Sequence, residues 1–174
     1  MDGIRKIDRQ IELELTASQI YRALEGACPD EEVKGLWHTL SVHEGYHAAA
    51  LEHLKQTLTP AELEKEASTL DMANIEALLS EHRAFLEEIP RGITVHRAFE
   101  IAIFMEFSEL NSLYFNAVRK GEKEEDSSPY LHSMGAGTRS HLLTLYRGIK
   151  AHGGEMDQVP YEEKFIALGL IDAP

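Results

Sequence analysis

The chain has 174 residues, 43% of them hydrophobic and 27% charged, which is the composition of one globular domain rather than of a disordered segment or a membrane span. Thirty acidic residues against seventeen basic ones give a formal charge of −13. Nucleic acid and anionic membrane surfaces are therefore excluded as expected partners, because both need a basic face on the protein.

Cys28 is the only cysteine, which excludes an intramolecular disulfide and a thiolate cluster built from this chain alone. We expect it to be a buried, inert thiol. Residues Met1 to Lys6 lead directly into an amphipathic pattern without a signal-peptide core, and polar residues interrupt every apolar stretch. These features predict a cytoplasmic protein with no transmembrane helix.

Apolar residues at helical spacing predict a first long helix over about residues 4–25, followed by Gly26 and Pro29, which are typical of a helix end. Asp30 is placed to cap a second long helix over about residues 31–58.

The next stretch, residues 59–92, begins with Thr59-Pro60-Ala61-Glu62, which predicts a capping box with proline at the first helical position. It contains one modest helix that ends near Pro90. A third long helix is predicted over about residues 94–119 and a fourth over about 129–152, before a tail over 153–174.

These lengths predict an all-α four-helix bundle in a single domain covering residues 1–174. Short links join the first helix to the second and the third to the fourth, which predicts two antiparallel hairpins. The stretch 59–92 is long enough to cross the whole length of the bundle, so we expect it to connect the hairpins.

Each long helix carries an ionisable residue near the middle of its apolar face. These residues are Glu14, then Glu44 and His47, then Glu106, and finally His141. A charged glutamate on a core face is costly unless it is paired or bound to a cation. Iron, manganese and zinc all accept carboxylate oxygen and imidazole nitrogen, and Glu44 and His47 share one helix face. The pattern predicts that these five side chains converge on one or two metal ions.

Three stretches resemble the ligand helices of ferritins. Arg9 to Tyr21 resembles the first ferritin helix, with Glu14 at the ligand position, and Glu44-Gly45-Tyr46-His47-Ala48 resembles the second. Met105-Glu106 through Leu113-Tyr114 is similar to the third, and Glu109, at Glu-x-x-Glu spacing, resembles rubrerythrin. For Glu109, a ligand and a solvated edge position both stay open.

The chain is thus identified as a member of the ferritin-like superfamily, similar to rubrerythrin but without its four-cysteine iron module. The resemblance implies two metal ions, most simply iron, with zinc or manganese able to substitute. It implies Glu14 as terminal ligand on one ion, Glu106 on the other, Glu44 as a bridge, and one imidazole each from His47 and His141. It also implies oxidation of ferrous iron or reduction of peroxide, a separate electron-donor protein, and a homodimer or small homo-oligomer.

The fourth helix departs from the family pattern. Where the family has Glu-x-x-His, this chain has Thr138-Arg139-Ser140-His141 and so lacks the second bridging carboxylate. We expect the ion held by Glu106 and His141 to be bound more weakly, or a single ion to be bound. Two functions therefore stay open, a di-metal oxidoreductase and a non-catalytic protein that buffers or senses metal. A purely structural bundle is disfavoured because inward ionisable groups without a cation would be desolvated and would repel one another.

Other polar residues have simpler interpretations. We expect Tyr21 and Tyr114 to pack in the core with hydrogen-bonded hydroxyls, and a supporting contact from them to a metal ligand is the alternative. The remaining histidines are interpreted as exposed or incidental: His38, His43, His53, His82, His96, His132 and His152.

Overall fold

The computed structural model describes residues 2–119, 129–153, 159–167 and 169–172, and within these the side chains of residues 69, 109–119, 129–136 and 159–160 are outside the description. No strand occurs among these residues, so the prediction of an all-α chain is confirmed for this part of the molecule.

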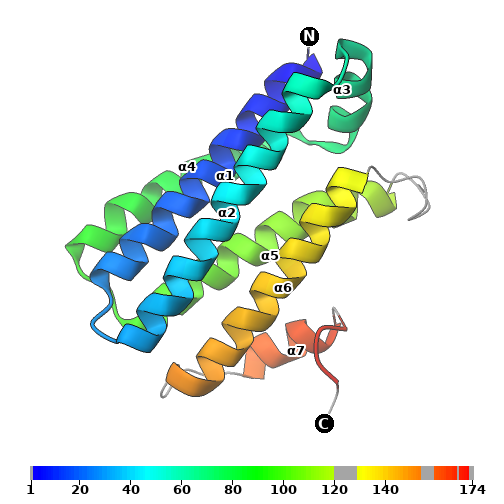
Figure 1. Cartoon of the computed structure of the whole chain (residues 1–174). Coiled ribbons are helices and arrows are strands. Elements are labelled where there is room, and N and C mark those ends of the chain that lie inside the picture. The colour runs from blue at the N-terminus through cyan, green and yellow to red at the C-terminus, as the bar shows by residue number, and fades with distance from the viewer. Residues whose placement is uncertain (1, 120–128, 154–158, 168, 173–174) are drawn as a thin grey trace.

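The described residues form four long α-helices and three shorter ones (Figure 1). The long helices are α1 (Asp2–Ala27), α2 (Glu31–Thr57), α5 (Val95–Arg119) and α6 (Pro129–His152). Between α2 and α5 lie α3 (Pro60–Glu66), a 3-10 turn (Ala67–Thr69), α4 (Met72–Glu88) and a second 3-10 turn (Ile89–Arg91). The C-terminal region contains α7 (Val159–Ala167).

The helix starts follow the capping residues of the sequence. The side chain of Asp30 accepts hydrogen bonds from the backbone N–H groups of Glu32 and Val33, which confirms the predicted cap of α2. At the start of α3, Thr59 and Glu62 form the predicted reciprocal capping box. These caps satisfy N–H groups that the first helical turn leaves without a partner.

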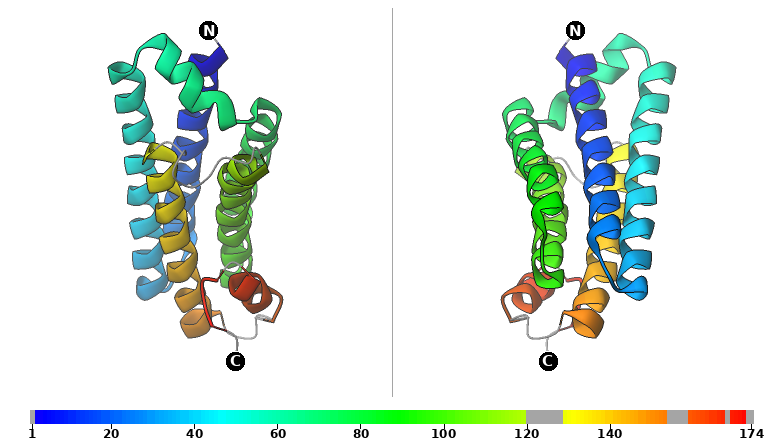
Figure 2. Two further views of the ribbon diagram at one scale, coloured as in Figure 1. Left: turned by 90° about the vertical axis from the view of Figure 1, so that its right-hand side faces the viewer. Right: turned by 90° about the vertical axis from the view of Figure 1, so that its left-hand side faces the viewer.

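The long helices pack in two pairs, α1 with α2 and α5 with α6, and α2 also contacts α6. Helix α3 crosses one end of the bundle, and α4 then runs back along α1 and reaches α5 (Figure 2). The connection between α2 and α5 is therefore itself largely helical. Helix α7 lies against the α5/α6 pair, where the ring of Phe165 packs against Phe107 and Tyr146.

Helices α1 and α2 meet at a pair of buried serines. The hydroxyl of Ser18 donates to the carbonyl oxygen of Ser41 at 2.8 Å, and the hydroxyl of Ser41 donates to the carbonyl oxygen of Ser18 at 3.0 Å. Each serine thus bonds to the backbone of the opposite helix, which requires the two backbones to approach closely.

Two large apolar clusters lie in the described part of the interior, one around Trp37 and Phe99 and the other around Ile7, Leu51 and Leu79. A smaller third cluster joins Leu142 to Phe165. Along α1 and α2, the ionisable residues of the predicted site fall between the residues of the two large clusters. Cys28 is buried at the edge of the first cluster, as expected. No described helix combines the length and the apolar character needed to cross a lipid bilayer.

Candidate metal centre

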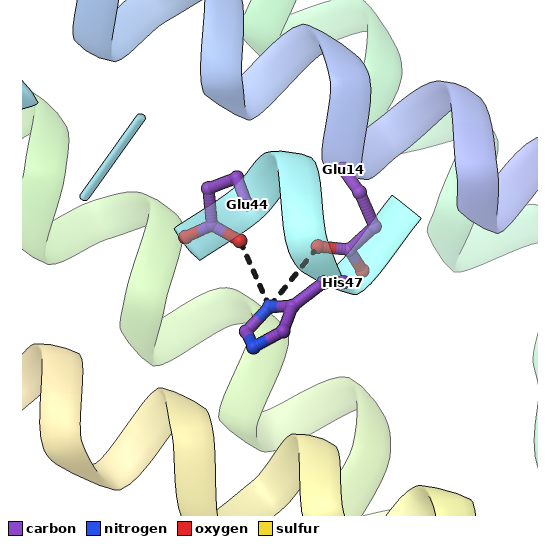
Figure 3. Close-up of side chains that lie close together, drawn as sticks. All are labelled: Glu14, Glu44 and His47. Carbon is purple, nitrogen blue, oxygen red and sulfur yellow. Dashed lines mark hydrogen bonds and ion pairs between the residues drawn. The ribbon is translucent and has the colours of Figure 1, made fainter. Parts of the chain in front are cut away.

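Glu14 from α1 and Glu44 and His47 from α2 form the first group of potential ligands (Figure 3). Nδ1 of His47 lies 3.0 Å from Oε2 of Glu44 and 3.7 Å from Oε2 of Glu14. One ligand atom from each of the three side chains lies within 4.8 Å of the other two, which is close enough to share one ion. Glu44 and His47 are three residues apart on α2 and so project from the same helix face.

A second group joins Glu44 to Glu106 on α5 and His141 on α6. Nδ1 of His141 lies 3.1 Å from Oε1 of Glu44 and 3.3 Å from Oε1 of Glu106. The two groups together draw on all four long helices, and each has two carboxylates and one imidazole. That composition suits iron, manganese or zinc rather than calcium or magnesium.

Glu44 belongs to both groups and faces each imidazole with a different oxygen. Oε2 lies beside His47, and Oε1 lies beside His141. The carboxylate is only 1% exposed, so it is shielded from bulk solvent. Glu44 thus connects the two groups of potential ligands through its two oxygens.

Neighbouring polar side chains hold the carboxylates in place. The amide of Gln10 donates to Oε1 of Glu14 at 2.7 Å, and the hydroxyl of Tyr21 donates to Oε1 of Glu106 at 2.6 Å. The expected hydrogen bond of the Tyr21 hydroxyl is therefore present, and it is made to a residue of the second group. Such contacts orient ligands and restrict their rotation.

Burial makes the carboxyl groups of Glu14 and Glu106 harder to ionise. It raises the pKa of Glu14 to about 7, and it also raises the pKa of Glu106. Burial acts in the same direction on Glu44, but its contacts with His141 and His47 outweigh it and hold the pKa of that carboxyl far below its usual range. Glu44 is therefore ionised at neutral pH.

The neighbouring carboxylates raise the pKa of both imidazoles. Burial favours the neutral ring, yet the contacts with Glu14 and Glu44 raise the pKa of His47 to about 10. Against the same opposing effect of burial, Glu106 and Glu44 raise the pKa of His141 to about 11. Without metal, two imidazolium ions thus balance the buried carboxylates.

Two buried ligand atoms of the second group have no hydrogen-bond partner in the described part of the chain. They are Nδ1 of His141 and Oε2 of Glu106. The His141 nitrogen is at ion-pair distance from two carboxylates but is not aligned for a hydrogen bond with either. Leaving buried polar atoms unsatisfied costs free energy, and a coordinated cation would remove that cost. The donor set therefore fits a metal ion.

The structure brings together Glu14, Glu44, His47, Glu106 and His141, all of which the sequence analysis named. The side chain of Glu109 lies outside the described residues. Thr138 is completely buried, one turn before His141. Each group offers three donors, so the donor count does not distinguish the two positions, and the unequal binding expected from Thr138 stays a prediction.

Two histidines that the sequence indicated as exposed or incidental lie close to the candidate site, His82 on α4 and His43 on α2. His82 on α4 was interpreted as exposed or incidental, but it is buried with 4% exposure, because α4 packs directly along α1. His43 is exposed, yet its Nδ1 lies 3.2 Å from Nε2 of His141. His82 follows Leu78 by four residues and precedes Phe85 by three, so it occupies the apolar face of α4, and that spacing was the available signal.

Comparisons of this chain with protein-family models, with curated proteins and with solved structures gave no match.

Proposed function

We propose that this chain is a ferritin-like protein that binds two transition-metal ions, most simply iron, and oxidises ferrous iron or reduces peroxide. The observation that carries the proposal is that Glu44 belongs to two groups of potential ligands at once. Glu14 and His47 would complete one position, and Glu106 and His141 the other. A stretch that crosses the bundle between α2 and α5 supports the ferritin-like arrangement.

The chemistry of the proposed reaction would come from the ions, since two bound irons can each donate one electron to an oxidant. The chain would provide positioning and proton storage. Burial raises the pKa of Glu14 to about 7, so this carboxyl group holds a proton in part of the metal-free molecules at neutral pH. Tyr21 and Gln10 hold the two terminal carboxylates in place. An external electron donor and a homodimer or small homo-oligomer are expectations that follow from the resemblance.

The second candidate function is non-catalytic metal binding for buffering or sensing. Thr138 favours it, because a fully buried neutral side chain stands where the resemblance leads us to expect a second bridging carboxylate. Without a second bridging carboxylate, Glu44 would be the only carboxylate shared by the two ions.

Anaerobic titration of the metal-free protein with ferrous iron, followed by addition of oxygen, tests the proposal. The titration counts the bound ions, and the absorbance of ferric iron then follows oxidation. We expect two irons per chain and oxidation faster than in a protein-free solution. Binding without faster oxidation would favour the buffering function, and no binding would contradict both.

The Thr138→Glu variant separates the two candidates further. If the missing carboxylate limits the site, this variant should bind both irons more tightly and oxidise them faster than the unmodified protein. Two tightly bound but inert irons in the variant would favour the non-catalytic function.

A further inference from the structure

A small cavity lies between the ligand carboxylates and helix α4. Its lining includes Glu14, Glu44 and Glu106 from the long helices together with Leu78 and His82 from α4. Its volume is about 10 Å³, close to the smallest that holds one water molecule. Neither His47 nor His141 lines it. The cavity therefore opens onto the carboxylates of both groups without passing the two histidines that belong to them.

His82 is an unusual residue for the wall of such a cavity. It is 4% exposed, and neither of its ring nitrogens has a hydrogen-bond partner in the described part of the chain. A buried imidazole without partners costs free energy that a leucine at the same place would avoid. The neighbouring cavity residues Leu13, Ala17, Leu78 and Met105 are apolar, so His82 contributes the polar nitrogen atoms on the α4 side.

The size and the chemistry of the cavity select a narrow class of occupants. A space for about one water molecule excludes organic substrates and leaves only molecules of a few atoms. The lining combines three potential metal ligands with an imidazole whose nitrogen atoms have no hydrogen-bond partner in the described part of the chain. A small molecule bound in this cavity would therefore share its walls with both the carboxylates and His82.

We propose that this cavity receives a diatomic molecule of the dioxygen class bound at the metal centre, and that His82 on α4 forms a hydrogen bond to it. This inference rests on the proposed function, because it needs metal ions at the carboxylates. It assigns to the connecting segment, and not only to the four long helices, a residue that contacts the reacting molecule.

Nitric oxide binding to the ferrous protein is the test. Nitric oxide is a stable diatomic probe, and its complex with ferrous iron is followed by absorbance and by electron paramagnetic resonance. We expect His82→Leu to raise the dissociation constant for nitric oxide about tenfold, the effect of losing one hydrogen bond. His82→Gln retains a donor and should keep most of the affinity. The control His53→Leu removes an exposed histidine from α2 and should change nothing.

Two further measurements make the result specific. The number of ferrous ions bound should be the same in the wild-type protein and in His82→Leu, because His82 contacts the diatomic molecule and not the metal. Metal-free His82→Leu should unfold at a higher urea concentration than the wild type, because leucine leaves no buried polar atom unsatisfied. This second measurement involves no metal, so it shows by itself that the variant folds.

Different results overturn different claims. If the wild type binds two irons and His82→Leu binds nitric oxide as tightly as the wild type, the inference is wrong and the proposed function stands. Loss of one iron from His82→Leu would also overturn it, since His82 would then be a metal ligand. If the wild type binds no iron, the proposed function fails and the inference fails with it.

Discussion

Nε2 of His47 lies so close to the backbone of Gly137 that a Cβ atom on that glycine would be 2.7 Å away from it. Gly137 belongs to α6 and His47 to α2, so this contact joins the first group of potential ligands to the helix that carries His141. The ring of His47 also packs against the ring of His141, with centroids 5.3 Å apart. A side chain at position 137 would therefore displace an imidazole of the proposed metal centre.

Gly137→Ala should weaken metal binding at the first group. The added methyl group has to push His47 away from Glu14 and Glu44, and displaced or poorly supported ligands cost about ten- to hundredfold in metal affinity. Isothermal titration with ferrous iron or cobalt measures the loss, and the second group should keep its ion.

Gly45→Ala is the matched control for Gly137→Ala. Gly45 lies between Glu44 and His47 on α2, and a Cβ added there meets no atom within 4 Å. Alanine in a helix interior is about 1 kcal/mol more favourable than glycine, so this variant should be slightly more stable and bind metal normally. Equal metal affinities for the two variants would contradict the role given to the close contact.

Metal binding should release protons and strengthen as pH rises. In the metal-free protein the pKa of His47 is about 10 and that of His141 about 11, so both rings are protonated at neutral pH. A metal ion binds only the unprotonated nitrogen, and binding two ions should therefore release about two protons from the rings and part of one from Glu14. Calorimetry in buffers of different ionisation enthalpy counts these protons. Affinity that does not change with pH would contradict the protonated state of the rings.

The metal-free protein should lose stability as the solution becomes more alkaline. The pKa of His47 is raised from 6.5 to about 10 in the folded state, so its contribution is fully present below the lower value and is lost as pH rises through the higher one. The pKa of Glu14 is raised from 4.5 to about 7, and its contribution likewise disappears as pH rises through that range. Urea unfolding from about pH 5 to about pH 9 should show the decline. A constant or rising free energy of unfolding over this range would be the contrary result.

Tyr21→Phe should destabilise the fold and disturb the second group. The substitution removes the 2.6 Å hydrogen bond to Glu106 and leaves a buried carboxyl oxygen unsatisfied, at a cost of about 1–3 kcal/mol. The same loss should raise the pKa of Glu106 further. Urea unfolding of the metal-free protein measures the change.

Tyr146→Phe provides the comparison for Tyr21→Phe. The hydroxyl of Tyr146 makes a longer contact of 3.4 Å with the carboxylate of Glu162 in a partly exposed position. Its loss should cost less than about 0.5 kcal/mol, because surface changes away from buried features have small effects. Equal costs for the two variants would show that burial of the Tyr21–Glu106 contact contributes nothing.

The candidate site was predictable because a charged residue on an apolar helix face is visible in the sequence. Glu14 and Glu106 each interrupt a regular apolar stripe, and burial of both confirms that these stripes face inward. The caps at Asp30 and Thr59 were visible for the same reason, since their signals lie within four consecutive residues. Local patterns thus predicted which residues turn inward and where two of the helices begin.

His82 and the His43–His141 contact depend on the arrangement of helices in space. Whether the apolar face of α4 is buried is decided by its packing along α1, a helix that ends more than forty residues earlier in the chain. Similarly, His43 and His141 are 98 residues apart, and only the packing of α2 on α6 brings their rings together. The spacing of His82 with Leu78 and Phe85 places it on the apolar face of α4, but it does not show what covers that face. The contact between His43 and His141 has no signature within a single segment of sequence.

The paired serines of α1 and α2 have a consequence for the spacing of the candidate ligands. Ser18 follows Glu14 by four residues and Ser41 precedes Glu44 by three, so the serines lie about one helical turn from both carboxylates. Their reciprocal bonds to the opposite backbones fix how far apart the two helices are at that level. Any ion that enters between Glu14 and Glu44 meets an opening whose width is already set. An ion too large for this spacing would have to turn the ligand side chains aside or break the serine hydrogen bonds that join the two helices.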